Sequence, residues 1–544
     1  MDKKRILMCT EFSELPTGYS VYSKQVLSRL NKYPEFEIAE LACYVSANDP
    51  RIPSVPWKVY ANKPLPNTPE HQEYKKSPIS EFGEYSYNSV LLDFKPDIVF
   101  DIRDFWMLAF ESNSPFRDFY NWAIMPTVDA EPQNPEWVDS YAQADAIFTY
   151  SEFGRDTLQK QSNNIKFVDI APPCASEVFT PVANKAEHRD KFGLNPGLYI
   201  IGTVMRNQRR KMYPDLFKAF RQFLDKTNRE DVFLHCHTSH PDIGWDMPSL
   251  IMEHGLSGKV LFTYKCKKCN TLSVDFFADA VKFCNNCRSF GNMIAGLNNA
   301  ITEEELAQVY NIFDIYVQYA NSEGFGMPQL EAAQCGNVVC SVDYSAMSSI
   351  IKNIEGYPIK VSEFYVEAET GCKRAIPDCG DFVNLLEFLT SLSKEALKQI
   401  GLKIRDKTKY HYNWDNTAKK WADYFMSVKK KDKRETWLSQ PKILQAAEFM
   451  NADIKSPMDQ ANFLVSEVLR KPEWIGRQVW RRLVKDLTYK STVESIGNFY
   501  FNESHSADAM KSKPFSFEDA YNSMRTLRDY YNIWENHRIG HLNK

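Results

Sequence analysis

Apolar and polar positions in the first 170 residues alternate between short β-rich runs and longer stretches with helical spacing. In residues 20–31, the apolar side chains Val21, Val26, Leu27 and Leu30 fall on one side of a helix. Strand-like runs occupy residues 4–10, 36–45, 97–102, 122–128 and 146–150. This order of elements predicts a parallel sheet that is covered by helices on both faces.

A second series of the same kind follows a proline-rich, less regular linker at residues 171–196. Its expected strands are 198–205, 232–237, 259–264, 314–320 and 337–342, and its expected helices are 214–227, 302–313 and 328–335. We therefore predict two Rossmann-like, doubly wound α/β domains, at residues 1–180 and 181–428. Ligands bind at the carboxyl ends of the strands in such sheets, so both domains are expected to face one cleft.

The segment SEGFGMPQLEAAQCG, which begins at Ser322, has the features of a ligand-binding turn. It follows a predicted strand and opens a helix, with Gly326 as a possible N-cap and a proline two residues later. The backbone amides of residues 324–327 can then face an anion. Glu323 stands in the loop, and Glu331, one turn into the helix, can reach a hydroxyl pair of the same ligand. The alternative is a glycine-rich turn with a solvated glutamate at each end.

With this pattern the chain resembles the retaining glycosyltransferases of family four, whose hallmark is Glu-x7-Glu in an E-G-F-G-x-P-x-x-E-A setting. The resemblance covers about residues 1–428 and implies a GT-B fold and sugar transfer from a nucleotide-sugar with retention of the anomeric configuration. It implies that Glu323 lies against the donor sugar and that Glu331 binds the donor ribose. The amides that it assigns to the donor belong to Gly324, Phe325, Gly326 and Met327.

Several cations follow the first strand of the second domain, in the sequence GTVMRNQRRK at residues 202–211. Fixed cations at a strand end can hold a diphosphate and neutralise the charge that develops on it as a leaving group. The family places an arginine and a lysine at this spacing, which makes Arg206 and Lys211 the candidates; a solvated basic loop is the alternative. Arg209 and Arg210 exceed the family pattern and could contact a polyanionic acceptor.

Two loops of the first domain carry further candidates. Gly18 lies in the turn after the first strand, where glycine lets the backbone approach a ligand and where the family has a glycine loop near the donor phosphates; a plain tight turn is the alternative. Asp129 stands near a position where family members commonly have a histidine. Asp129 could orient or deprotonate the acceptor hydroxyl, or it could cap a turn.

Two CxxC pairs separated by fourteen residues form a third signal. The cysteines Cys266, Cys269, Cys284 and Cys287 supply four thiolates for a tetrahedral Zn²⁺ and leave no open coordination position, which predicts a structural zinc ribbon at residues 264–292. The ribbon interrupts the second domain at a strand's carboxyl end, and ordinary family members lack it. Its lysines and Arg288 suit contact with phosphates; the alternative is a ribbon that only stiffens a loop or contacts the C-terminal region.

The overall composition, 544 residues with 43% hydrophobic and 25% charged, excludes disorder and a small disulfide scaffold. The net charge of -4 would by itself argue against a nucleic-acid binder. That charge is unevenly distributed, because residues 401–544 hold 26 basic and 18 acidic residues and leave a net -12 for residues 1–400. We expect residues 429–544 to form a basic helical extension. Its stretch 470–485 interleaves cations with tryptophans, as nucleic-acid binding requires; a packed helix with a solvated face is the alternative.

No apolar stretch approaches the roughly 18 to 20 residues of a membrane span, and the N-terminal apolar run is too short for a secretory signal. Cysteines in strand-like surroundings, such as Cys9 and Cys340, are typical of buried thiols in a reducing compartment. These features predict a cytoplasmic protein without a membrane span, located in the host cytoplasm if the protein is viral.

Together the motifs predict a retaining hexosyl- or pentosyltransferase that uses a UDP- or GDP-sugar. The chain has no Asp-x-Asp, the metal-holding motif of the other major glycosyltransferase fold, so catalysis is expected not to need a divalent cation. The basic ribbon and extension favour a hydroxymethylated base in DNA as acceptor, similar to phage DNA-modifying glycosyltransferases. The alternatives are a surface-polysaccharide or lipid-linked glycan acceptor, and a zinc-dependent nucleic-acid-binding protein on an inactive core.

Overall fold

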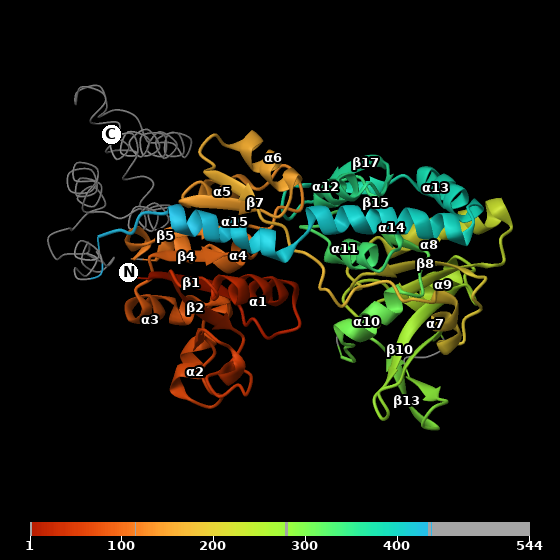
Figure 1. The fold of residues 1–544 in the computed structure, drawn as a ribbon, viewed down its shortest axis with the longest axis horizontal. Coiled ribbons are helices and arrows are strands. Elements are labelled where there is room, and N and C mark those ends of the chain that lie inside the picture. The colour runs from red at the N-terminus through yellow and green to blue at the C-terminus, as the bar shows by residue number, and fades with distance from the viewer. Residues whose placement is uncertain (1–2, 115, 278–280, 297, 433–436, 438–544) are drawn as a thin grey trace, which may run out of the picture. The chain divides into compact units, whose positions relative to one another are not determined.

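The computed structural model describes residues 3–114, 116–277, 281–296, 298–432 and 437. The chain divides into two compact units: Met1–Gly83, Ile98–Leu108 and Asn121–Lys429 form the first, and Glu84–Asp97, Ala109–Tyr120 and Lys430–Lys544 form the second. The first unit contains two sheets, and the parts of it built on each sheet are here called the first and second lobes (Figure 1). Residues 84–97 and 109–120, which were predicted to lie in the first domain, belong to the second unit. Nearly all of the predicted C-terminal extension, including residues 470–485, lies outside the described residues.

The first lobe contains a seven-stranded sheet in the order β3-β2-β1-β4-β5-β6-β7, in which every neighbouring pair is parallel. Its strands are β1 (Lys4–Glu11), β2 (Phe36–Cys43), β3 (Lys58–Ala61), β4 (Ile98–Asp101), β5 (Asn121–Ile124), β6 (Ala146–Thr149) and β7 (Phe167–Ile170). Its helices are α1 (Gly18–Leu30), α2 (Pro69–Tyr74), α4 (Phe105–Leu108), α5 (Pro135–Tyr141) and α6 (Glu152–Gln161), with 3-10 turns η1 (Ile52–Ser54) and η2 (Pro78–Phe82). The strand order is that of a doubly wound nucleotide-binding sheet, as predicted.

The second lobe is built on six parallel strands in the order β10-β9-β8-β14-β15-β16. These strands are β8 (Tyr199–Val204), β9 (Val232–His237), β10 (Val260–Cys266), β14 (Ile315–Gln318), β15 (Val338–Val342) and β16 (Tyr357–Ile359). The helices are α7 (Lys185–Lys191), α8 (Tyr213–Thr227), α9 (Met247–Glu253), α10 (Glu303–Tyr310), α11 (Met327–Gln334), α12 (Ser345–Ile354), α13 (Cys379–Ser391) and α14 (Lys394–His411). Helix α7 lies inside the segment that was expected to be an irregular linker.

The ribbon is continuous with the second sheet, because one strand belongs to both (Figure 1). Residues 260–262 of β10 pair with β9 in parallel, whereas residues 264–266 of the same strand pair with β13 in antiparallel fashion. The remaining ribbon strands are β11 (Leu272–Phe276), β12 (Val281–Cys284) and β13 (Ser289–Ile294). The ribbon therefore extends from the carboxyl end of β10, as the sequence predicted.

Two further elements connect the lobes. A two-stranded hairpin, β17 (Val361–Val366) and β18 (Lys373–Pro377), lies between β16 and α13. The last described helix, α15 (Trp414–Ser427), packs on α1 of the first lobe. There the Trp421 ring stacks on Phe148 at 3.9 Å between centroids, and its Nε1 donates to the Tyr22 hydroxyl at 2.8 Å.

The described part of the second unit contains α3 (Glu84–Phe94) and the 3-10 turns η3 (Glu111–Asn113) and η4 (Arg117–Phe119). Across the parts of the chain that the structure describes, none of the helices is both long enough and apolar enough to cross a membrane.

Candidate functional site

The turn between β14 and α11 has the geometry that its sequence predicts. Gly326 is the N-cap of α11 and adopts a left-handed conformation with φ of 100°, and Pro328 stands in the first helical turn. The positive φ favours glycine here, and a Cβ at Gly326 would lie 2.5 Å from Nε2 of Gln329, so that side chain would also have to move. Pro328 has no N–H and the Gln329 N–H donates to the Gly326 carbonyl at 3.1 Å, so the N–H groups of Gly326 and Met327 are the ones available to a ligand, at the carboxyl edge of the sheet.

Glu323, in the middle of this turn, is buried at 5% exposure and is held by charged and polar partners. Lys211 Nζ forms an ion pair with Oε1 of Glu323, and Arg210 Nη1 donates to Oε2. Gln318 Nε2 also donates to Oε1, at 2.7 Å. Burial and then the neighbouring Arg210 charge lower the pKa of Lys211 well below its usual range. Two basic side chains therefore lie against one carboxylate, and an anionic ligand bound beside them would favour the protonated form of Lys211.

The structure shows where the cations of the basic loop lie. Arg210, which exceeds the family pattern and was a candidate for contact with a polyanionic acceptor, contacts Glu323. Arg206 forms a partly exposed pair with Asp242, with N···O distances of 3.1 and 3.2 Å. Of the two predicted donor cations, only Lys211 lies against Glu323, because the chain reverses through the turn at residues 206–211 and Lys211 bridges to Ala320 beside β14.

Asp129 is joined to the Glu323 turn by an arginine that the sequence did not single out. Arg374, on β18, donates through Nη1 both to Oδ2 of Asp129 and to Oγ of Ser322, each at 2.6 Å. A second nitrogen, Nη2, donates to Glu367 at 2.7 Å. The Arg374 side chain is only 9% exposed. The buried Arg374 guanidinium therefore connects the loop after β5 with the residue that precedes Glu323. No local sequence pattern around residue 374 predicts this contact.

A close contact between the lobes lies on the other side of Glu323. A Cβ at Gly324 would lie 2.3 Å from Cγ2 of Thr127, so glycine allows the turn to approach the first lobe. The Thr127 hydroxyl in turn lies 2.9 Å from that of Tyr19. Burial raises the pKa of Asp104, which is hydrogen-bonded to both hydroxyls. No pattern in the sequence assigns a role to Asp104, which follows β4.

Three other residues were predicted to bind the donor: Glu331, Phe325 and Gly18. Glu331 accepts a hydrogen bond of 2.7 Å from the Tyr310 hydroxyl, and burial raises its pKa to about 7. The Phe325 ring is buried against Tyr150 and Tyr412, which leaves only its backbone for a ligand. Gly18 is the first residue of α1, with open space where a Cβ would stand. The space around Gly18 therefore does not itself demand glycine.

An aromatic cluster on α4 and α5 of the first lobe was also not predicted from the sequence. Phe105 stacks on Trp137 with centroids 5.4 Å apart, and Trp106 meets Trp137 edge to face at 6.4 Å. The Trp106 side chain is 52% exposed. These rings lie on α4 and α5, which follow the carboxyl ends of β4 and β5, and α5 also carries the exposed carboxylates of Glu136 and Asp139.

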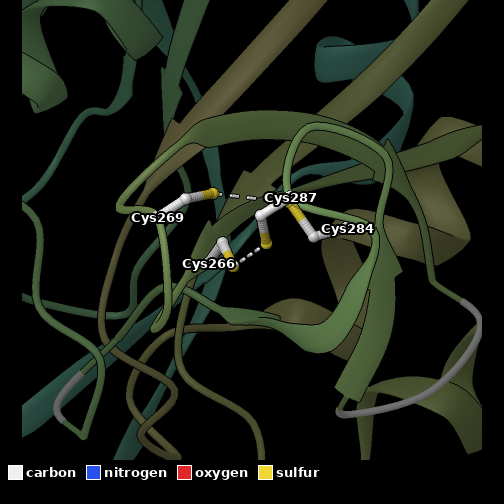
Figure 2. A group of neighbouring side chains, drawn as sticks. All are labelled: Cys266, Cys269, Cys284 and Cys287. Atoms are coloured by element: carbon white, nitrogen blue, oxygen red, sulfur yellow. Dashed lines mark hydrogen bonds between the residues drawn. The ribbon is translucent and has the colours of Figure 1, made fainter.

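The four ribbon cysteines converge as their spacing predicts (Figure 2). All four Sγ atoms lie within 4.8 Å of one another. The Sγ atoms of Cys266 and Cys287 are 3.6 Å apart, and those of Cys269 and Cys284 are 3.7 Å apart. A tetrahedral zinc with Zn–S bonds of 2.3 Å needs sulfur separations of about 3.8 Å, so the cluster fits such an ion. The arrangement can hold a metal ion, and all four protein ligands would be sulfur.

Comparison with known proteins assigns the fold. Residues 297–366 match the sequence profile of the family described as "Glycosyl transferases group 1". Sucrose-phosphate synthase of Thermosynechococcus elongatus is similar in structure, with 14% identity, a TM-score of 0.54, and coverage of 78% of this chain and 98% of that chain. We found no curated protein whose sequence matches this chain.

Two further similar structures hold nucleotide ligands. An E. coli structure described as trehalose-6-phosphate bound with UDP-2-fluoro glucose has 10% identity, a TM-score of 0.53, and coverage of 79% of this chain and 100% of that chain. HepE of Anabaena, in complex with UDP and glucose, has 12% identity, a TM-score of 0.53, and coverage of 78% and 100%. These similarities confirm the predicted GT-B fold, and the matched profile covers the turn that contains Glu323.

Proposed function

We propose that the protein is a retaining glycosyltransferase that moves a hexosyl or pentosyl group from a UDP- or GDP-sugar to a hydroxymethylated base in DNA. The observation that carries the transferase assignment is the buried Glu323 carboxylate between Lys211 and Arg210, at the N-terminus of α11. The matched profile over residues 297–366 and the UDP complexes of similar structures support it. In this proposal, residues 1–180 bind the acceptor and residues 181–428 bind the donor.

The charges of the cluster suit the two ends of a nucleotide-sugar. Lys211 and Arg210 can neutralise the diphosphate, and the α11 amides of Gly326 and Met327 add hydrogen bonds and the positive end of the helix dipole. Glu323 then meets the sugar hydroxyls, and Glu331 accepts from the ribose. Arg206 stays a candidate diphosphate ligand, because its side chain is 43% exposed and Asp242 keeps hydrogen bonds from the Ser239 hydroxyl and the Ile243 N–H if Arg206 turns to a ligand.

The transfer step follows from this placement. The bond between the anomeric carbon and the diphosphate oxygen breaks, and a bond to the acceptor oxygen forms on the same face of the sugar. The acceptor proton passes to the departing phosphate oxygen, while the cations stabilise the negative charge that develops there. Asp129, fixed by Arg374, orients the acceptor hydroxyl. No step requires the ribbon cysteines, to which we assign a structural Zn²⁺.

The exposed lysines and Arg288 of the ribbon support a DNA acceptor, since cations that face solvent attract phosphates. All 12 cysteines are free, which supports a reducing, cytoplasmic location. A glycan is the second candidate acceptor. The exposed Trp106, in edge-to-face contact with Trp137 of α5, favours a neutral sugar, because an aromatic face attracts polarised C–H groups and the exposed carboxylates of α5 can accept from hydroxyls.

The transferase assignment is tested with a panel of UDP-, GDP- and ADP-sugars, by protection against thermal unfolding and by turnover. The matching donor raises the melting temperature, because it binds only the folded chain. In Glu323→Gln, turnover falls by about 100-fold or more, as when one transition-state partner is removed. Glu253→Gln, at an exposed position on α9, is the control. A folded Glu323→Gln variant with wild-type turnover would show that Glu323 is not part of the machinery.

The acceptor is tested with duplex DNA that contains hydroxymethylcytosine and with neutral oligosaccharides, each with donor labelled in the sugar. Transfer of label to DNA alone supports the first candidate, and transfer to oligosaccharide alone replaces it by the second. If the chain binds DNA but transfers nothing from any donor, it is a nucleic-acid-binding protein on an inactive core.

A further inference from the structure

Two phenylalanine side chains of the ribbon are exposed to an unusual degree for apolar rings. The Phe283 side chain on β12 is 48% exposed, and that of Phe290 on β13 is 73% exposed. The two residues are cross-strand partners, and their rings meet edge to face with centroids 5.4 Å apart. Exposed apolar side chains that gather in one place mark binding surfaces, and this pair lies on a small ribbon that the fold does not need.

Cations adjoin this ring pair. Lys267, Lys268 and Arg288 are exposed, and none of them has an ion-pair partner in the described part of the chain. The backbone of Lys267 lies against β13, because its N–H donates at 2.9 Å to the carbonyl of Gly291, which is next to Phe290 in sequence. Arg288 precedes Phe290 by two residues. The rings and these three cations are called the ribbon platform below.

Two acidic side chains in the described part of this neighbourhood are paired with lysines. Asp275 pairs with Lys282 at 2.8 Å, and Glu305 pairs with Lys265 at the same distance. The Lys282 ammonium also lies 4.8 Å from the Tyr264 ring centroid, so it is held within the ribbon. The charge that the ribbon platform offers to a ligand is therefore positive, and its apolar part consists of aromatic faces and edges.

We propose that the ribbon platform binds the unpaired bases of a single-stranded nucleic acid. Bases stack on aromatic rings without regard to sequence, and adjacent cations hold the phosphates, so this combination is the one that a single strand needs. A duplex hides its base faces and would use the cations alone. The inference rests on the DNA acceptor of the proposed function, to which it adds the form of DNA that is held.

The position of the ribbon suits strand binding close to the Glu323 turn. Strands β10, β9, β8 and β14 are parallel, so the ribbon leaves the sheet at the same edge at which the Glu323 turn lies. Three strand spacings separate β10 from β14, about 14 Å in all. A base can reach an enzyme's reacting groups only after it leaves its stack. A single strand held on the ribbon platform would keep the target region open beside the site.

The test measures binding of a fluorescent single-stranded oligo-dT to the full-length, zinc-loaded protein. In the Phe283→Ala/Phe290→Ala double variant, affinity falls by about 30-fold or more, because one stacked base is lost per ring. Phe388→Ala removes a ring that is 49% exposed on α13 and serves as the matched control, with unchanged affinity. Zinc content and melting temperature are measured for each variant, so that loss of the ribbon fold is recognised.

A second variant tests the cations without touching the rings. Lys267→Ala/Lys268→Ala weakens binding and reduces the slope of log affinity against log salt by about 1.4, at about 0.7 per phosphate contact on a single strand. Duplex of the same length binds more weakly than oligo-dT and is insensitive to the phenylalanine substitutions.

Three results would overturn the proposal: no binding of oligo-dT, binding that the phenylalanine substitutions leave unchanged, or equal losses for duplex and single strand. Binding that persists in the double variant would assign the strand to another part of the chain. Donor protection against thermal unfolding is measured on the same variants. If donors fail to protect but the ring dependence holds, the transferase assignment fails alone; if donors protect and oligo-dT binding ignores the rings, only the ribbon platform fails.

Discussion

At the scale of single residues, the candidate site depends on how burial and charge are balanced. Glu323 is buried but is compensated by Lys211 and Arg210, and Asp129 is compensated by Arg374. Removing one partner of a buried charge pair leaves the other uncompensated, which costs more than an exposed pair would. A substitution at one of these positions therefore changes both the local charge and the orientation of the partner side chain.

Arg374 is a positioning residue, and its replacement tests that role. We expect Arg374→Met to lower kcat/KM about 10- to 100-fold, because hydrogen bonds to charged groups contribute about 1.5–3 kcal/mol. Arg374→Lys restores only part of the activity, since one ammonium lacks the planar fork that reaches Asp129, Ser322 and Glu367 together.

Steady-state kinetics with varied acceptor and donor measure this effect, with the partly exposed Arg155→Met as control. The loss should appear in kcat and in the acceptor KM, while donor protection against unfolding persists. Equal weakening of both substrates would indicate a general structural role instead.

His235 on β9 allows a pH prediction whose sign is clear. Burial, and then neighbouring His237, lower the pKa of His235 to about 3. Below pH 6.5, His235 becomes protonated in the unfolded chain but stays neutral in the folded chain. The free energy of unfolding therefore decreases as pH falls. The loss between pH 7.5 and pH 5 amounts to about 2 kcal/mol.

Because glutamine does not titrate, the free-energy difference between wild type and His235→Gln should shrink by about 2 kcal/mol over the same interval. Urea unfolding at both pH values measures it, with exposed His411→Gln as control. The comparison between the two proteins is needed because Glu40 changes stability with pH in the opposite direction. Burial raises the pKa of Glu40 to about 7, so the stability that Glu40 contributes is lost as pH rises from 4.5 to 7. A pH-independent difference would contradict the prediction.

At the scale of elements, regular spacing in the sequence produced the clearest predictions. The CxxC pairs gave the convergent thiols of the ribbon, and the glycine-proline pattern gave the N-terminus of α11. The hairpin β17–β18 was not anticipated, although it carries Arg374. Buried and exposed positions do not alternate along β17, where five of the six residues are exposed, so the sequence pattern did not predict a strand there.

The ribbon should hold one zinc per chain in protein purified without chelator, and Cys284→Ser should reduce this to a small fraction. Three remaining thiolates cannot complete the tetrahedron. The parallel sheet should survive, because residues 260–262 of β10 pair with β9 independently of the cysteines.

Zinc analysis together with circular dichroism measures both outcomes. Cys379→Ser, outside the cluster, is the matched control and keeps its zinc. Zinc well below one equivalent in the wild-type protein would contradict four-cysteine ligation.

At the scale of the whole first unit, the chain's return through α15 ties the second lobe to the first. Lys4 Nζ donates to the carbonyl of Phe425 at 2.6 Å, although the two residues are 421 positions apart. Helices α6 and α12 also pack together, and the N–H of Phe153 donates to Ser349 Oγ at 3.1 Å. The hydrogen bond from Lys4 and the packing of α15 on α1 mean that α15 stabilises the first lobe although it follows the second in sequence.

Trp421→Ala should therefore reduce the free energy of unfolding by about 3–5 kcal/mol, the cost of emptying a buried aromatic site. Urea unfolding followed by circular dichroism measures the change. Tyr410→Ala, which removes an aromatic side chain that is 78% exposed, should change stability by no more than about 0.5 kcal/mol. A similar, small effect for both variants would show that α15 is not an integral part of the first lobe.

The sequence alone determined the two doubly wound sheets, the turn around Glu323 and the four-cysteine cluster, because each depends on residues close together in the chain whose periodicity or spacing is visible. Tertiary structure alone decided that Arg210 rather than Arg206 meets Glu323, and that Arg374 holds Asp129. Asp129 and Arg374 are 245 positions apart, and such a pair leaves no local pattern. The contact of Arg210 with Glu323 is set by how two loops of the second lobe pack, whereas the pair of Arg374 and Asp129 forms only when the second lobe meets the first.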